Sequence, residues 1–385
     1  MAPTFCAAVT VALTLSTAVT ANPRPVTITK TKEVYKTEWR THTETKTVSA
    51  GCSASSSPST ASSPPSSASS SSSSPSGYPS SPKNYWPGWA GITHMVTFGD
   101  SYSTTGFNDT GAQPSIANPL GNPAYPGYTA TNGPNWVDFL TTTYNKTFVE
   151  TVNLAYGGAT VDSALVTPYL PTVLSVKQQV NDEFVPVYAN KTVIPWASYD
   201  SLFGIFIGIN DVGNSYSSQN ASLNTIIFNE FSGLVDELYQ TGARNFLFLN
   251  VPPVNRAPLT SAQGASVQAL EAADIKDWNK RLIQLGNNLT NIYSDATVFQ
   301  FDTNKIFAQV LDDPCSHPQT CPYKNTTDYC VAYENGTPSW YTFNATCGVP
   351  VDEYFWLNSL HPTFRMHNAT AEAIAEELSC GKCRR

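Results

Sequence analysis

The sequence predicts one catalytic α/β domain with a three-layer α/β/α architecture and a mainly parallel central sheet. Two observations lead to this prediction. From about residue 91 to the end of the 385-residue chain, short apolar runs alternate with amphipathic stretches. Hydrophobic residues make up 41% of the chain, which is enough to bury a core. Alternating strands and helices build parallel sheets that are covered by helices, so we expect a single domain over residues 92–385.

The first 91 residues are expected to lie outside this domain. Residues 1–21 contain an apolar run that ends in the small residues Val19-Thr20-Ala21, as in a secretory signal peptide. Residues 22–91 combine a Thr-rich polar strip with a linker in which 25 of the 30 positions from Ser53 to Pro82 are Ser, Thr or Pro. Such a segment cannot bury enough apolar surface to offset its chain entropy, so we expect it to be disordered and O-glycosylated.

In the rest of the chain, apolar runs of strand length alternate with helical patterns. The predicted strands are His94–Phe98, Phe148–Leu154, Leu202–Ile207, Asn245–Asn250 and Thr297–Phe301. The predicted helices are Asn135–Thr143, Leu223–Gln240, Ala262–Asn288 and Ala371–Leu378. The third helix is the clearest, because apolar residues recur along it near every 3.6 positions. Catalytic groups collect where parallel strands end, and a cysteine-rich insertion near residues 312–352 is expected on that face.

Sequons and cysteines indicate a secreted glycoprotein, either free or associated with the cell wall. Nine Asn-x-Ser/Thr sequons begin at Asn108, Asn145, Asn190, Asn220, Asn288, Asn325, Asn335, Asn344 and Asn368. Six cysteines in the last 71 residues predict up to three disulfides whose pairing the sequence leaves open: Cys315, Cys321, Cys330, Cys347, Cys380 and Cys383. The last two could instead form a redox CxxC motif. Cys52 is free or intermolecular.

Charge and composition exclude several classes of partner. The formal net charge is −8 and Lys and Arg do not cluster, which argues against a nucleic-acid partner. No segment of the mature chain approaches 18 consecutive apolar residues, so we expect no membrane span. The five histidines form no HExxH motif, and we expect neither a metal nor another cofactor. The oligomeric state is left open.

Two motifs that follow the first two strands could supply a nucleophile and a site for a developing negative charge. Gly99-Asp100-Ser101 puts Ser101 on a tight turn near backbone N–H groups. Taken alone, the tripeptide is more typical of a turn with a Ser N-cap. Gly157-Gly158 follows the second strand. Because glycine has no side chain, a backbone N–H could approach a ligand here, although an ordinary turn is the alternative interpretation.

Two further motifs could supply a donor and a base. Asn210 follows the apolar strand Leu202–Ile207, and its side-chain N–H could point at an oxyanion, although an Asn-Asp helix cap is the simpler interpretation. His361 lies in an irregular segment before the last helix. A single histidine beside a proline is usually structural, but a nucleophilic serine needs a base whose pKa is near neutrality, and imidazole meets that need.

These four motifs, in this order between His94 and Met366, resemble those of the GDSL or SGNH hydrolases, which have a flavodoxin-like fold. Within that superfamily the chain looks most like fungal carbohydrate esterase family sixteen acetylesterases, with plant-type GDSL lipases next. The resemblance implies that Ser101 is the nucleophile and His361 its base. It also implies an oxyanion hole made of the Ser101 and Gly158 N–H groups and the Asn210 side chain. The implied substrates are small acetyl esters, such as acetylated plant cell-wall oligosaccharides.

One position departs from the family pattern. The family usually has an aspartate three residues before the histidine, where this chain has Asn358. The usual carboxylate fixes the histidine tautomer, and in a serine protease its replacement by Asn costs about 10⁴ in rate. We hypothesise that the carbonyl oxygen of Asn358 orients His361 instead, as in Cys-His-Asn enzymes. A neighbouring carboxylate such as Asp352 is the alternative.

Other candidates and other functions remain as alternatives. Glu271, Asp274 and Asp277 resemble a paired-carboxylate site but are interpreted as the solvated face of the long helix. Trp136, Trp196 and Trp356 are typical core residues, although Trp356, five positions before His361, could stack on a sugar. The alternative functions are a lipase or phospholipase acting on longer acyl chains and an inactive carbohydrate-binding protein of the cell wall.

Overall fold

The computed structural model describes residues 85–220 and 222–380; the predicted signal peptide, most of the predicted linker, Cys52 and Cys383 lie outside these residues. The described residues belong to one compact unit, Gly77–Arg385. The strands are β1 (His94–Gly99), β2 (Glu150–Asn153), β3 (Ser201–Phe206), β4 (Asn245–Leu249) and β5 (Thr297–Phe301). The helices are α1 (Trp136–Thr142), α2 (Val176–Gln178), α3 (Val185–Val187), α4 (Ile209–Ser215), α5 (Leu223–Thr241), α6 (Pro258–Ser261), α7 (Ala265–Ile292), α8 (Thr303–Asp312) and α9 (Phe364–Cys380).

The five strands form one sheet in the order β2-β1-β3-β4-β5, and every neighbouring pair is parallel. The strands are almost fully buried, as expected for a sheet covered on both faces. β1 pairs with β3 up to Gly99↔Phe206, so these two strands end side by side. Because all strands run in the same direction, the segments that follow them emerge at one edge of the sheet.

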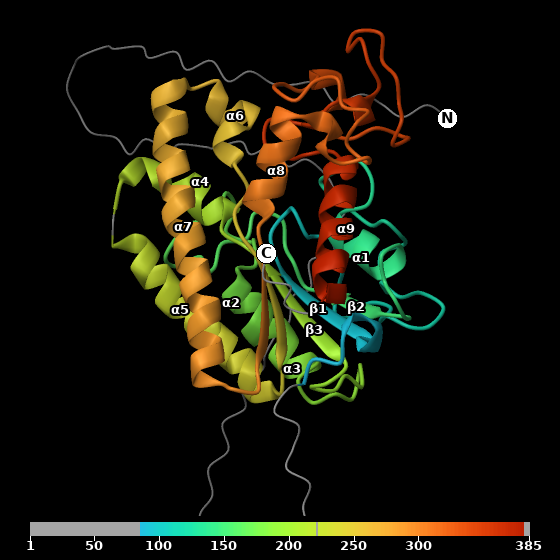
Figure 1. Cartoon of the computed structure of the whole chain (residues 1–385), viewed down its shortest axis with the longest axis vertical. Coiled ribbons are helices and arrows are strands. Elements are labelled where there is room, and N and C mark those ends of the chain that lie inside the picture. The colour runs from blue at the N-terminus through green and yellow to red at the C-terminus, as the bar shows by residue number, and fades with distance from the viewer. Residues whose placement is uncertain (1–84, 221, 381–385) are drawn as a thin grey trace, which may run out of the picture. The chain divides into compact units, whose positions relative to one another are not determined.

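Helices cover the two faces of this sheet (Figure 1). The pair α5 and α7 packs on one side, and α1 and α9 pack against each other on the other side. Two glycines of the β3 region allow close packing: the Trp136 ring of α1 lies beside Gly204, and the Trp278 ring of α7 lies against Gly208. The predicted three-layer architecture with a parallel sheet is therefore confirmed.

The ordered domain begins earlier than predicted. We assigned residues 85–91 to the disordered linker, and for these seven residues that assignment is wrong. Trp89 is only 2% exposed, and its Nε1–H donates to the Tyr144 carbonyl oxygen at 2.9 Å. Trp86 packs its ring on Phe299 of β5 with 4.6 Å between ring centroids. These two indole rings pack the segment onto the domain, although a proline and a glycine lie between them in the sequence.

The helices near the C-terminus also differ from the prediction. α8 was not predicted, although Asp302 caps it by accepting from the Lys305 N–H at 3.1 Å. α9 begins at Phe364, directly after the His361 segment, rather than at residue 371. Phe364, Met366 and His367 are buried in its first turn. No helix among the described residues is both long enough and apolar enough to cross a membrane.

The aromatic and acidic candidates set aside above lie in the core or between helices. Trp136, Trp196 and Trp356 are at most 2% exposed, so the suggestion that Trp356 could stack on a sugar is wrong. The interpretation of the acidic residues of α7 as a solvated face is wrong for Glu271, which is 3% exposed. Asp274 and Asp277 both accept from the Asn224 side chain and so link α7 to α5.

Candidate active site

Ser101 lies on a tight turn directly after β1. Gly99 has φ +151°, and a side chain there would collide with the Phe206 carbonyl oxygen of β3, so only glycine allows the chain to turn at this point. The amide of Gln179 holds both the N–H and the carbonyl oxygen of Gly99 at 2.9 Å. Asp100 is fully buried and accepts the Tyr102 N–H at 2.9 Å. The turn is therefore fixed from both sides, and it presents Ser101 at the edge where the strands end.

The fold brings Ser101, His361 and Asn358 into one hydrogen-bonded chain. Ser101 Oγ lies 2.8 Å from His361 Nε2, and His361 Nδ1 lies 2.9 Å from Asn358 Oδ1. The serine and the histidine are separated by 260 positions in the sequence. The segment that follows the cysteine-rich insertion and leads into α9 carries the histidine to the serine.

The contacts of Asn358 determine the protonation of His361. Besides the imidazole, the Asn358 side chain receives the backbone N–H of Leu360 at 3.1 Å and of His361 at 2.9 Å. Two donors point at one atom of the amide, so that atom must be the oxygen. An oxygen can only accept from Nδ1, which therefore carries the ring proton. Nε2 is then left as the acceptor that faces the Ser101 hydroxyl, which is the tautomer a general base requires.

Desolvation of its ring lowers the pKa of His361 to about 4. The imidazole is therefore neutral at neutral pH and able to accept a proton. No carboxylate contacts the ring in the described structure, because the atom at Nδ1 belongs to an amide. This is the physical difference from a triad with aspartate, in which a negative charge stabilises the imidazolium.

The three predicted oxyanion donors come from the turns after β1, β2 and β3. The backbone N–H groups of Ser101 and Gly158 make no hydrogen bond to another described residue, which leaves them available. Gly158 has φ +87°, a conformation that favours glycine. The Asn210 amide donates one N–H to the Ala159 carbonyl oxygen at 3.0 Å, and an amide nitrogen has a second.

α4 fixes the turn that contains Gly158. Next to Asn210, Asp211 accepts the Val161 N–H with both carboxylate oxygens, at 3.0 and 3.2 Å. Asp211 is 1% exposed, and burial raises its pKa to about 7. Our sequence analysis considered a helix cap at this motif and did not identify Asp211 as an anchor. The contact joins segments 50 positions apart, and nothing local in the sequence points to it.

Other buried polar residues that hold the serine turn were also missed. Asn135, the N-cap of α1, donates to the carbonyl oxygens of Ser103 and Thr104 at 2.7 and 2.9 Å. Asn153, the last residue of β2, also donates to the Ser103 carbonyl oxygen at 2.7 Å. The sequence signals that could have revealed these contacts were a polar residue at the start of a helix, Asn135, and one at the end of a strand, Asn153.

Tyr102 connects the serine turn to the histidine segment. Its hydroxyl donates to the Leu360 carbonyl oxygen at 2.7 Å, and its ring centroid lies 5.7 Å from that of His361. The side chain is 1% exposed. Tyr102, which follows Ser101, thus holds Leu360, which precedes His361. The sequence analysis did not anticipate this contact.

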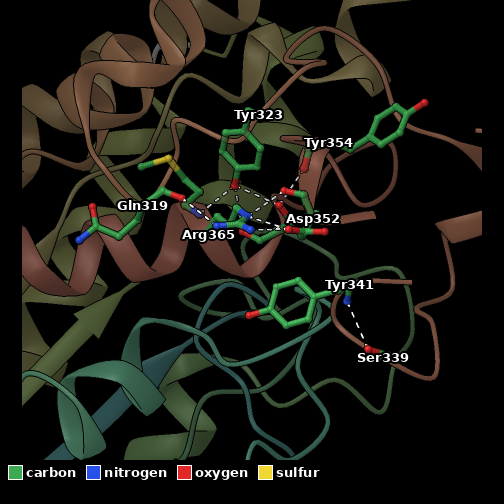
Figure 2. A network of polar contacts seen from close by, with 9 residues as sticks. Gln319, Tyr323, Ser339, Tyr341, Asp352, Tyr354 and Arg365 are labelled. Carbon is green, nitrogen blue, oxygen red and sulfur yellow. Dashed lines mark hydrogen bonds and ion pairs between the residues drawn. The ribbon is translucent and has the colours of Figure 1, made fainter. Parts of the chain in front are cut away.

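The alternative that Asp352 orients His361 is wrong. Figure 2 shows the Asp352 carboxylate directed at the Arg365 guanidinium, with which it forms an ion pair. Arg365 Nε also donates to the Asp352 backbone carbonyl at 3.1 Å, and Nη1 donates to the Gln319 carbonyl at 3.3 Å. Asp352 therefore ties the insertion to the first turn of α9 and does not contact the imidazole.

The cysteine-rich insertion contains two disulfides, Cys315–Cys321 and Cys330–Cys347, out of the up to three that the sequence predicted without a pairing. Of the two remaining cysteines, Cys383 lies outside the described residues. The Glu334 carbonyl oxygen in the same insertion accepts the Asn358 Nδ2–H at 3.4 Å. Two cavities, of 610 and 400 Å³, lie elsewhere on the molecule, beside β5 and between α5 and α7, and neither is lined by Ser101 or His361.

Comparisons with known proteins identify the family of this chain. A profile of the GDSL-like lipase/acylhydrolase family matches residues 95–374. An acetylesterase from Thermothelomyces thermophilus is 37% identical over 286 residues, covering 74% of this chain and 87% of that protein. A GDSL esterase/lipase from Arabidopsis thaliana is 24% identical over 231 residues, covering 54% of this chain and 58% of that protein.

A solved structure of an acetylxylan esterase from Geobacillus stearothermophilus is also similar. It has a TM-score of 0.42 and 13% identity, covering 74% of this chain and 94% of the other. The family match spans the sheet, the serine turn and the histidine segment. The chain therefore belongs to the GDSL-like lipase/acylhydrolase family and is a carboxylic ester hydrolase.

Proposed function

We propose that this chain is a secreted serine esterase that removes acetyl groups from plant cell-wall oligosaccharides. The observation that carries the proposal is the chain of contacts from Ser101 Oγ through His361 to Asn358 Oδ1, with distances of 2.8 and 2.9 Å. The 37% identical protein is an acetylesterase, which favours acetyl esters. The oligosaccharide part rests on the resemblance to carbohydrate esterase family sixteen.

In this mechanism His361 Nε2 takes the proton of the Ser101 hydroxyl while Oγ attacks the ester carbonyl carbon. The negative charge that develops on the carbonyl oxygen is stabilised by the N–H groups of Ser101 and Gly158 and the side chain of Asn210. The carbon–oxygen bond to the sugar then breaks, and the proton on His361 goes to the leaving alkoxide. Water, deprotonated by His361, attacks the acetyl-enzyme and releases acetate and free Ser101.

Export is supported by two features of the described residues. Two disulfides are typical of proteins that fold in an oxidising compartment. The sequon asparagines at positions 108, 190, 220, 288 and 335 are exposed, as glycan acceptors must be. Together with the apolar run of residues 1–21, these features favour a secreted glycoprotein.

The mechanism is tested with Ser101→Ala. We expect acetate release from p-nitrophenyl acetate to fall at least a thousandfold, and labelling by a fluorophosphonate probe to disappear. Ser198→Ala is the matched control, because Ser198 is also partly exposed but precedes β3, at the opposite end of the strands. Parental activity in Ser101→Ala would eliminate the proposal.

The substrate class is tested with the parent enzyme. Acyl-chain profiling from acetate to palmitate should give the highest kcat/KM at acetate, whereas a maximum at long chains would favour the lipase alternative. Acetate release from acetylated xylan and glucomannan fragments then tests the carbohydrate part. A parent protein that neither reacts with the probe nor releases acetate would instead be a binding protein.

A further inference from the structure

Tyr169 lies against the turn that carries Gly158 and is largely open to solvent. The residue is 71% exposed. A Cβ atom placed on Gly158 would lie 2.2 Å from Cε1 and 2.6 Å from Cδ1 of the Tyr169 ring, but 3.5 Å from Cζ. The nearest atoms belong to one edge of the ring, so the contact with the turn is edge-on. The faces of the ring are therefore not covered by Gly158.

The loop that carries Tyr169 is held by two hydrogen bonds to the residues just before it. The Thr160 hydroxyl donates to the Val166 carbonyl oxygen at 3.0 Å. Asn214 of α4 donates to the Thr167 carbonyl oxygen at 3.3 Å. Since α4 also contains Asn210 and Asp211, the same helix fixes the Tyr169 loop and the proposed oxyanion turn. The ring is thus positioned with respect to the reacting ester.

A second tyrosine lies on the adjoining turn. Tyr156 is 36% exposed, and its backbone N–H donates to the Gly99 carbonyl oxygen at 3.0 Å. Burial raises the pKa of Tyr156, and the Tyr169 hydroxyl raises it further. Ser101 and Gly158 therefore share one rim with two aromatic side chains that expose a third or more of their surface.

The burial of apolar surface does not explain why the Tyr169 ring lies beside Gly158. A ring that remains 71% exposed removes little apolar area from water and so contributes little to stability. A long acyl chain would need an enclosed apolar channel, since its methylene groups gain only from leaving water. An open, flat ring with a hydroxyl at its edge instead matches a sugar, which has an apolar C–H face and polar edges.

We propose that Tyr169 is the stacking platform for the sugar that carries the scissile acetyl group. The proposal rests on the function proposed above and adds the residue that would distinguish a sugar acetate from a simple acetate. The sugar ring lies against an open face of Tyr169, while its acetyl carbonyl reaches the N–H groups of Ser101 and Gly158. Tyr169 takes no part in the bond-breaking steps, so its contribution is to substrate binding.

The test compares two substrates in three variants. For Tyr169→Ala we expect kcat/KM on acetylated xylotriose to fall about tenfold, mostly through KM, because the stacking contact is lost. We expect kcat/KM on vinyl acetate to stay within about twofold, because that substrate has no sugar to stack. Tyr169→Phe keeps the ring and should retain activity on both. Tyr199→Ala is the matched control, an equally exposed tyrosine (62%) before the start of β3.

Each other outcome overturns the proposal. Equal losses on both substrates in Tyr169→Ala would mean that the ring only supports the Gly158 turn. No loss on acetylated xylotriose would mean that the sugar does not contact Tyr169. Failure of the proposed function is recognised separately, because the parent enzyme would then cleave vinyl acetate but release no acetate from any acetylated oligosaccharide.

Discussion

Asn358 makes the hydrogen bonds that the aspartate of a triad would make, without its charge. Its amide oxygen accepts three N–H groups, from Leu360, from the His361 backbone and from the His361 ring. This fixes the tautomer, which is the part of the aspartate's role that depends on geometry. It leaves out the electrostatic part, so nothing among the described residues offsets the desolvation that lowers the pKa of His361 to about 4.

Asn358→Asp should therefore shift the pH profile. In the parent enzyme His361 is active when neutral, so kcat/KM should fall only as the pH drops through about 4. A carboxylate at position 358 favours the imidazolium and raises the pKa of His361, which moves this acidic limb to higher pH. The measurement is acetate release between pH 3 and 8. An unchanged limb would show that position 358 does not orient His361.

Tyr102→Phe tests the contact between the serine turn and the histidine segment. Removing the hydroxyl deletes the hydrogen bond to the Leu360 carbonyl, worth about 1 kcal/mol, and lets the His361 segment shift. We expect kcat to fall by about three- to tenfold while KM stays unchanged, because the substrate does not contact this buried ring.

The control for Tyr102→Phe is Tyr188→Phe. Tyr188 is equally buried and loses a similar hydrogen bond, to Gln113 at 2.9 Å. It should cost comparable stability in thermal melts but leave kcat unchanged. Equal effects of the two variants on kcat would contradict a positioning role for Tyr102.

At the scale of elements, the cysteine-rich insertion acts as a frame for the His361 segment. Its disulfides close loops of 6 and 17 residues, and the Asp352–Arg365 pair joins it to α9 (Figure 2). The Tyr323 hydroxyl adds a contact by accepting the Met366 N–H at 2.8 Å. Asn358 and His361 lie in the sequence between Asp352 and Arg365. The insertion and α9 together therefore determine the position of the imidazole.

Asp352→Asn should lower stability without changing the pH dependence of catalysis. It leaves Arg365, whose side chain is only 21% exposed, without its ionic partner, which should cost about 2–3 kcal/mol in the free energy of unfolding. The acidic limb of kcat/KM should stay where it is, because Asp352 does not contact His361. Urea unfolding and a pH profile of the same variant check both parts. A displaced limb would return Asp352 to the role of orienting residue.

At the scale of the whole molecule, several buried carboxyl groups should make the protein less stable in alkaline solution. Burial raises the pKa values of Asp100, Asp138 and Glu183 to about 8. These groups keep a proton in the folded state that they have lost in the unfolded state, so their stabilising effect disappears as the pH rises toward 8. Histidines oppose the effect only weakly, since His361 and His367 are neutral in the folded state and are already half deprotonated in the unfolded state at pH 6.5.

We therefore expect a higher melting temperature at pH 6.5 than at pH 8.5. In Asp138→Asn the difference should be smaller, because one of the three groups no longer titrates. Asp138 is suited to this substitution, since its neutral carboxyl accepts the Asn135 N–H at 2.9 Å through one oxygen, and an amide oxygen can do the same. A melting temperature that is constant or rises between these pH values would contradict the assignment of neutral buried carboxyls.

The fold could be predicted where the signal is local and repeated along the chain. Apolar runs located all five strands. Because the motifs follow predicted parallel strands, their side chains were expected at the edge of the sheet where the strands end. The start of α9 could not be predicted, because its first residues become buried only when they pack against other elements. Burial of Glu271 and of Trp356 depends in the same way on partners distant in the sequence.

The amino-acid sequence by itself determined the α/β class, the parallel sheet, the candidate serine and histidine, and the replacement of the usual aspartate by Asn358. Only the tertiary structure decided that the Asn358 oxygen, rather than Asp352, meets His361, and that Tyr169 stands beside Gly158. The physical reason is that strand and helix patterns arise from neighbours along the chain. Hydrogen bonds such as that between Ser101 and His361 join residues 260 positions apart, which meet only once the sheet and helices have packed.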